Sequence, residues 1–162
     1  MATGDMFLKL DTIDGESQDS THTNEIQILS FSTGWANQGS GNVGMGSGTS
    51  KVNPSDFTFT HYVDKASYGL FNAVCTGKTV GSAKITIRKA GGDSPVEYLV
   101  YDLTEVFVSS VQTSGSDGGG LAIESFSLNY AACTITYTIQ NADGTAGAAV
   151  PKSYNFKTGV AT

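Results

Sequence analysis

The two histidines are the side chains in this chain best suited to moving protons near neutral pH, but neither has the companions that catalysis needs. His22 lies in the polar segment Asp-Ser-Thr-His-Thr-Asn-Glu, and His61 shares a strand face with Phe57 and Phe59. A serine nucleophile is typically presented by a G-x-S-x-G turn, and the sequence has no such motif. We therefore interpret His22 as a solvated side chain and His61 as a packed one, and we predict that the protein is not an enzyme.

The remaining chemical motifs are equally incomplete. Asp11, Asp14, Glu16 and Asp19 could bind calcium, but their spacing lacks the register and the closing glutamate of an EF-hand, and a turn explains Asp-Gly equally well. The glycine run at 118–120 precedes a strand-like segment rather than a helix with a lysine, so it indicates a hairpin loop and not a phosphate site. We expect no metal and no cofactor.

Cys75 and Cys133 are the two cysteines, and neither belongs to a CxxC pair. A single disulfide is compatible with the sequence. The favoured interpretation is two buried free thiols that pack as small apolar side chains, because sequence spacing alone does not bring them together.

Composition restricts the classes of partner. The 162 residues carry a formal net charge of −6, a sequence pI of about 4.6 and only 15% charged residues. An acidic chain is unsuited to binding nucleic acid or an anionic membrane surface, because both carry negative charge. The start has no basic and apolar leader, and no apolar run reaches the ~18 residues of a membrane span. We expect one domain, 1–162, that is made in the cytoplasm, and its low charge suggests a surface covered by partners.

Most of the chain has the two-residue periodicity of β-strands. Apolar and polar residues alternate over 57–62, 84–88 and 134–139, and turn signals separate these segments. Many short strands predict a mainly β sandwich or barrel. We expect the polar residues Lys84, Thr86 and Arg88 to meet water.

Two segments depart from this pattern. Residues 64–77 predict one helix that Asp64 caps and Gly77 ends, with Ala66, Leu70, Ala73 and Val74 on its apolar face. Residues 34–50 form a glycine-rich loop, yet this loop contains Trp35 and Met45. A spacer needs no tryptophan, so we expect the loop to dock on another subunit.

Several segments, in order and at matching spacing, together resemble the haemolysin-coregulated protein (Hcp) family of type VI secretion systems over nearly the whole chain. They are residues 5–10, 14–17, 22, 25–26, 53–62, 64–67, 83–92, 96–98, 105–111 and 124–130.

This resemblance implies a closed antiparallel β-barrel of two packed sheets, with one short helix and a long glycine-rich loop, assembling as a hexameric ring. It implies stacked rings that form a secreted inner tube, that work with spike and sheath components and that bind and protect effector proteins in the lumen. The loop residues implied to contact neighbouring subunits and rings are Trp35, Met45 and Lys51. Export would proceed through the machine without a cleaved signal peptide.

The strand 25–33 supplies the residues expected at the lumen. Alternation places Leu29 and Phe31 in the core and Ile28, Ser30 and Ser32 on the opposite face. In a ring that turns one sheet inwards, Ser30 and Ser32 would line the channel and contact effectors. The alternative function is a phage-like tail tube protein of a related contractile injection machine. A hydrolase or a carbohydrate-binding module finds less support, since the chain has neither a catalytic set nor a series of aromatic platforms.

Overall fold

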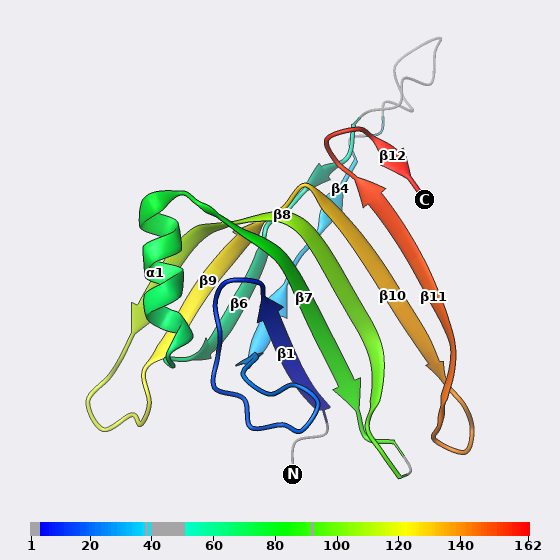
Figure 1. Cartoon of the computed structure of the whole chain (residues 1–162), viewed down its shortest axis with the longest axis horizontal. Helices are drawn as coiled ribbons and strands as arrows, with labels where there is room; N and C mark the ends of the chain where they lie inside the picture. The colour runs from blue at the N-terminus through cyan, green and yellow to red at the C-terminus, as the bar shows by residue number, and fades with distance from the viewer. Residues whose placement is uncertain (1–3, 38, 40–50, 92) are drawn as a thin grey trace.

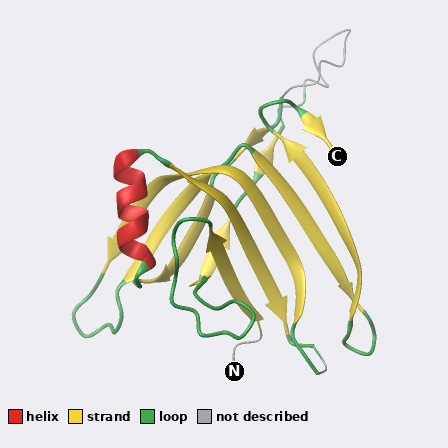
Figure 2. Cartoon of the chain, in the orientation of Figure 1, coloured by secondary structure: helices red, strands yellow, loops and turns green. Residues whose placement is uncertain are grey.

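The computed structural model describes residues 4–37, 39, 51–91 and 93–162 as strands wrapped around one core, with a single helix alongside (Figures 1 and 2). The strands are β1 (Gly4–Leu10), β2 (Ile26–Gln27), β3 (Ser30–Ser32), β4 (Trp35–Ala36), β5 (Asn53–Pro54), β6 (Phe57–Tyr62), β7 (Thr79–Lys89), β8 (Val96–Ser114), β9 (Ile123–Asn129), β10 (Ala132–Gln140), β11 (Ala146–Asn155) and β12 (Val160–Ala161). The helix is α1 (Ala66–Thr76).

A ten-stranded antiparallel sheet carries the fold, and β8 joins its two halves. One path runs in the order β12-β11-β10-β8-β7-β1-β2, while β9 leads from the other half of β8 to β6 and β3. The change of neighbour occurs at Glu105, where pairing with β10 has ended and pairing with β9 has not begun. Glu105 has a φ of 51°, in the left-handed region, and this bend turns the strand from one half of the sheet to the other.

The closed barrel expected from the sequence is not what the structure describes. The sheet curves over itself, but its pairing path is open, ending at β12 and β2, and the described residues form one large sheet and one small β4–β5 ribbon. The reason lies at β2 and β3, which are two and three residues long and pair with different strands, β1 and β6. Such short pairings do not make one continuous closing strand.

The core lies between the two halves of the curved sheet. Alternation in β6 and β9 turns Phe57, Phe59, Phe126 and Leu128 inward, and each is fully buried. The ring of Phe57 meets that of Tyr101 from β8 edge to face, with centroids 5.2 Å apart. The strand face expected for 57–62 is therefore confirmed, and β9 contributes the facing rings.

Helix α1 packs beside the sheet as its sequence predicted. Ala66, Leu70 and Ala73 are buried, and Gly77 adopts the left-handed φ of 66° that ends the helix. The carboxylate of Asp64 accepts the Ala66 N–H at 2.9 Å. Among the described residues, no helix is long and apolar enough to cross a membrane.

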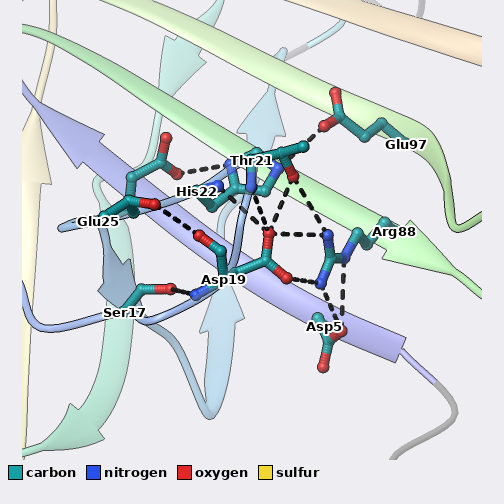
Figure 3. A network of polar contacts seen from close by, with 9 residues as sticks. Asp5, Ser17, Asp19, Thr21, His22, Glu25, Arg88 and Glu97 are labelled. Atoms are coloured by element: carbon teal, nitrogen blue, oxygen red, sulfur yellow. Dashed lines mark hydrogen bonds and ion pairs between the residues drawn. The ribbon is translucent and has the colours of Figure 1, made fainter.

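A cluster of charged side chains fastens the segment 11–25, which has no helix or strand of its own, onto β1 and β7 (Figure 3). Arg88 of β7 forms ion pairs with Asp5 of β1 and Asp19 of the segment. Its guanidinium also lies 4.8 Å from the ring centre of Phe7. Hydrogen bonds from Arg88 hold the pKa of Asp19 well below its usual value. We name this group the Arg88 clamp.

The prediction that Arg88 and Thr86 meet water is thus wrong, because Arg88 is taken up by the clamp and Thr86 is buried. Lys84 is exposed as expected. The sequence of β7 alone does not indicate that the segment 11–25 covers part of the polar face of this strand.

The prediction for His22 is also wrong, since this side chain is buried beside the clamp. Its Nδ1 lies 2.8 Å from Glu25 Oε2 and its Nε2 lies 2.9 Å from Glu97 Oε1, while the ring stacks on Phe7 at 4.5 Å. Both ring nitrogens of His22 therefore face carboxylate oxygens, one from the same segment and one from β8. His61 is packed as expected, fully buried with Nε2 2.9 Å from Glu124 Oε1.

Both cysteines are free thiols, but they differ in exposure. Cys133 is buried, and burial raises the pKa of its thiol to about 12. Cys75 is exposed at the end of α1, contrary to the expectation that both would be buried.

We predict that iodoacetamide modifies Cys75 in the folded protein and reaches Cys133 only after denaturation, because the thiolate is the reacting form. Peptide mass spectrometry measures both. Reducing agent should leave the thermal midpoint unchanged, and detection of a native Cys75–Cys133 bridge would overturn this assignment.

A second prediction concerns the clamp. Arg88→Met should lower the free energy of unfolding by about 2–3 kcal/mol, since it leaves clustered carboxylates without their cation. Because the pKa of Asp19 is depressed in the folded state, its stabilisation is complete above about pH 4 and is lost as the pH falls. The Arg88→Met variant should not show this loss of unfolding free energy at acid pH, which urea unfolding titrations at a series of pH values measure.

Lys84→Met on the same strand is the matched control, and its effect should stay within about 0.5 kcal/mol. Equal losses for the two variants would show that the ion pairs of Arg88 do not fasten the segment.

Candidate functional site

The outer face of β3, β6, β9 and the second half of β8 carries small hydroxyl side chains in place of charges. This face results from strand alternation, because the sequence neighbours of these residues point into the core. Strand register aligns the side chains in two rows, Ser32–Thr58–Ser127–Ser110 and Ser30–Thr60–Ser125–Gln112. We name these eight residues the hydroxyl face.

Hydrogen bonds run across the strands of this face. Thr58 Oγ1 lies 3.3 Å from Ser127 Oγ, which accepts from Ser110 Oγ at 3.0 Å. Ser30 Oγ likewise contacts Thr60 Oγ1. Five of the eight side chains are thus hydrogen-bonded to another residue of the face, and all but Gln112 are short hydroxyl side chains.

Ser30 and Ser32 are exposed and point away from the core, as the sequence predicted. The prediction fails for Ile28 and Leu29, the two residues before them. Ile28 is 4% exposed and Leu29 is 42% exposed, the reverse of the expectation. The Ile28 N–H donates to Met6 of β1, whereas the Leu29 N–H donates to Thr60 of β6. The change of partner strand breaks the alternation at this point. Phe31 packs against Tyr101 at 5.9 Å, as expected of a core residue.

Trp35 anchors the base of the glycine-rich loop onto its own subunit. Its Nε1–H donates to the Tyr130 hydroxyl at 3.0 Å, and its ring lies 6.3 Å from that of Phe57. Burial raises the pKa of Tyr130, and the hydrogen bond from Trp35 opposes this shift. The indole remains 38% exposed, so part of its surface is open to a neighbour.

A cavity of about 780 Å³ lies between this loop base and β10–β11. Its walls include Trp35, Tyr154 and Phe156, and its charged lining residues are Lys51, Lys152 and Lys157. We name it the basic cavity. Lys157 forms an ion pair with Glu105, whereas Lys51 and Lys152 have no ion pair among the described residues.

The structure therefore brings Trp35 and Lys51 together and leaves Ser30 and Ser32 on a separate surface. Met45 lies outside the described residues. Lys152, Tyr154 and Phe156 also line the basic cavity and were not among the predicted site residues. Lys152 and Tyr154 share one face of β11, and this two-residue spacing, which continues to Phe156 just after the strand, was the signal that could have found them.

No group of three or more His, Cys, Asp or Glu side chains in the part of the chain that the structure describes could hold a metal ion. The two histidines are held by carboxylates in buried contacts. The features of this surface are those of contact and packing.

Comparison with known proteins agrees with this interpretation. The family model described as type VI secretion system effector, Hcp, matches residues 7–137. Protein hcp1 of Pseudomonas aeruginosa is 45% identical over 140 residues, which are 86% of this chain and 86% of that protein.

Solved structures match over almost the full length. A structure of a type six secretion system protein has a TM-score of 0.91 at 32% identity, covering 98% of this chain and 99% of its own. Hcp1 from Salmonella typhimurium has a TM-score of 0.81 at 33% identity, covering 99% of this chain and 100% of its own. With a family model and a relative of this identity matching most of its length, the chain belongs to the Hcp family of type VI secretion systems.

Proposed function

We propose that six copies of this chain close into a ring, that rings stack into the inner tube of a type VI secretion machine, and that the hydroxyl face lines the lumen. Hcp proteins are structural tube subunits and not enzymes. The proposal therefore concerns how copies assemble and what they carry.

The observation that carries the lumen assignment is the hydroxyl face itself. Its two rows contain no charged residue, although the chain has a net charge of −6. Short hydroxyl groups leave a channel wide and bind water or cargo through hydrogen bonds. The face is thus suited to holding and releasing folded effector proteins.

Trp35, Met45 and Lys51 are proposed to contact neighbouring subunits and stacked rings. Two of them have support in the structure: part of the Trp35 indole is exposed, and the Lys51 ammonium forms no ion pair with any residue that the structure describes. A partly buried aromatic side chain beside a cation is a frequent anchor of protein interfaces.

The chain would be cytoplasmic before assembly and would leave the cell through the machine, with spike and sheath components as further partners. The alternative is a tail tube of a related contractile injection machine. The match of residues 7–137 to the Hcp family model favours the secretion system.

Purified protein should behave as a closed ring with a mass about six times the 16.8 kDa of one chain. Multi-angle light scattering measures this mass, and negative-stain microscopy should show particles with an open centre. A stable monomer at micromolar concentration would refute the proposal.

Ser32→Glu should leave the ring intact and lower the level or export of at least one co-expressed effector, because a long charged side chain would enter the lumen. Asn72→Glu adds the same charge on the exposed side of α1 and should change neither property. Normal export of every effector by the Ser32 variant would remove Ser32 from the lumen. Failure of the ring itself would place Ser32 at an interface.

A further inference from the structure

The basic cavity concentrates positive charge on an acidic chain. Lys51, Lys152 and Lys157 line it, three of the nine basic residues of a chain whose formal net charge is −6. No aspartate or glutamate is among its described lining residues. Lys157 is paired with Glu105, but Lys51 and Lys152 form no ion pair with any residue that the structure describes. Their two ammonium groups can therefore bind an anion that comes from outside the chain.

The floor of this cavity is uncharged apart from its rim and belongs to the antiparallel pair β10–β11. Strand register places Cys133 opposite Tyr154 and Ile135 opposite Lys152, and all four residues line the cavity. Burial raises the pKa of the Cys133 thiol to about 12, so this side chain stays neutral near neutral pH. A mostly apolar floor with a few charged groups beside it is the usual construction of a small-molecule site.

The aromatic walls of the cavity are held in place by contacts that lie outside it. Tyr130 joins two of them, since its hydroxyl accepts the Trp35 Nε1–H at 3.0 Å and its ring meets that of Phe156 edge to face at 5.6 Å. The ring of Tyr154 lies 5.0 Å from that of Phe156. Because these contacts already order the side chains, binding of a flat ring against them costs little further conformational entropy.

We propose that the basic cavity binds a small aromatic anion, meaning a flat ring that carries a phosphate or carboxylate group. The ring packs against Trp35 and Tyr154, and the ammonium groups of Lys51 and Lys152 bind the anionic group. The cavity volume of about 780 Å³ lies within the range of about 300–1,000 Å³ that is typical of such sites. The inference goes beyond the proposed tube, and it applies to a subunit whose cavity no neighbouring copy covers.

The form of the site favours a small molecule that has both a ring and a charge. A nucleic acid backbone requires basic residues in a row along a surface, whereas these lysines surround one cavity on an acidic chain. Inorganic phosphate would use the lysines but leave the aromatic walls without a partner ring. A neutral ring would use the walls and leave both ammonium groups without a counter-charge.

Trp35 is the only tryptophan of the chain, so its fluorescence reports directly on what enters the cavity. Adenosine monophosphate and benzoate are the anionic probes, and adenosine and benzamide are their uncharged counterparts. Each anion should change the emission of Trp35 saturably and bind about tenfold more tightly than its counterpart, because only the anion gains charge-assisted contacts. The tighter of the two anions distinguishes a phosphate ligand from a carboxylate ligand. Raising the salt from about 0.05 M to about 0.5 M should remove most of the difference.

Substitution of single lysines then locates the binding. Lys51→Met and Lys152→Met each remove one ammonium group and keep an apolar side chain of similar length, so each should raise the Kd of adenosine monophosphate about tenfold. Lys78→Met is the matched control, because Lys78 is exposed and lies outside the cavity, and its Kd should stay within about twofold of the original. Unchanged emission of Trp35 in each ligand-free variant reports an intact cavity.

Emission that neither anion alters would overturn the ligand site. Equal affinity for adenosine and adenosine monophosphate would reduce it to an apolar pocket, and equal affinity for inorganic phosphate would show an adventitious ion only. Equal effects of the Lys152 and Lys78 variants would place the binding elsewhere. Light scattering on the same samples measures the ring separately, so loss of the ligand site leaves the proposed tube in place, and binding by a protein that forms no rings refutes only the tube.

Discussion

Arg88 is one of the side chains that hold the chain in place as it approaches β2 and β3. The segment before them has no helix or strand, and a few backbone bonds, such as Gly15 N–H to Asn24 O at 2.8 Å, hold it to itself. The ion pairs of Arg88 with Asp5 and Asp19 attach it to the sheet. A shift of one residue in β3 would exchange its two faces, turning Ser30 and Ser32 inward and Phe31 outward. The polarity of the hydroxyl face therefore depends on this register, in which Ser30 and Ser32 pair with Thr60 and Thr58 of β6.

Charge is distributed unevenly over the subunit in a way that suits its family. The hydroxyl face is uncharged, whereas Lys51, Lys152 and Lys157 line the basic cavity at one end of the strands. In the proposed ring these lysines would act between copies, where a neighbour excludes water and strengthens their interactions. In the proposed tube an uncharged lumen wall would exert little electrostatic preference on what passes along it. The same strands thus present two environments, one proposed for assembly and one proposed for cargo.

The sequence predicted the parts of this molecule that depend on local periodicity. The alternation of Phe57 and Phe59 with threonines, and the helix ended by Gly77, follow from spacing and backbone preference, and both are found. The errors occur where distant segments meet. Leu29 is exposed because the chain changes its partner strand beside it, and His22 is buried because Glu97 of β8 lies opposite. Neither contact has a signal in the neighbouring residues.

The candidate site was likewise predictable only in the part that depends on local periodicity. Ser30 and Ser32 could be placed from strand alternation, but the rows that they form with Ser127 and Ser110 require the register between four strands. The basic cavity combines Lys51 with Lys152, which are about a hundred residues apart in the chain. Only the folded arrangement of the loop base against β11 brings them together.

The long strand β8 has a mechanical consequence. Its 19 residues pair with β7 on one side from Lys89–Val96 to Thr79–Phe107, and with β10 and then β9 on the other. A load applied along this strand acts in shear on many ladder hydrogen bonds at once, so no single bond bears it alone. The left-handed turn at Glu105 is the place where the strand exchanges β10 for β9 as its neighbour, and we expect the strand to bend most easily there. A subunit pushed along its strands would therefore transmit force through these ladders and yield first at Glu105.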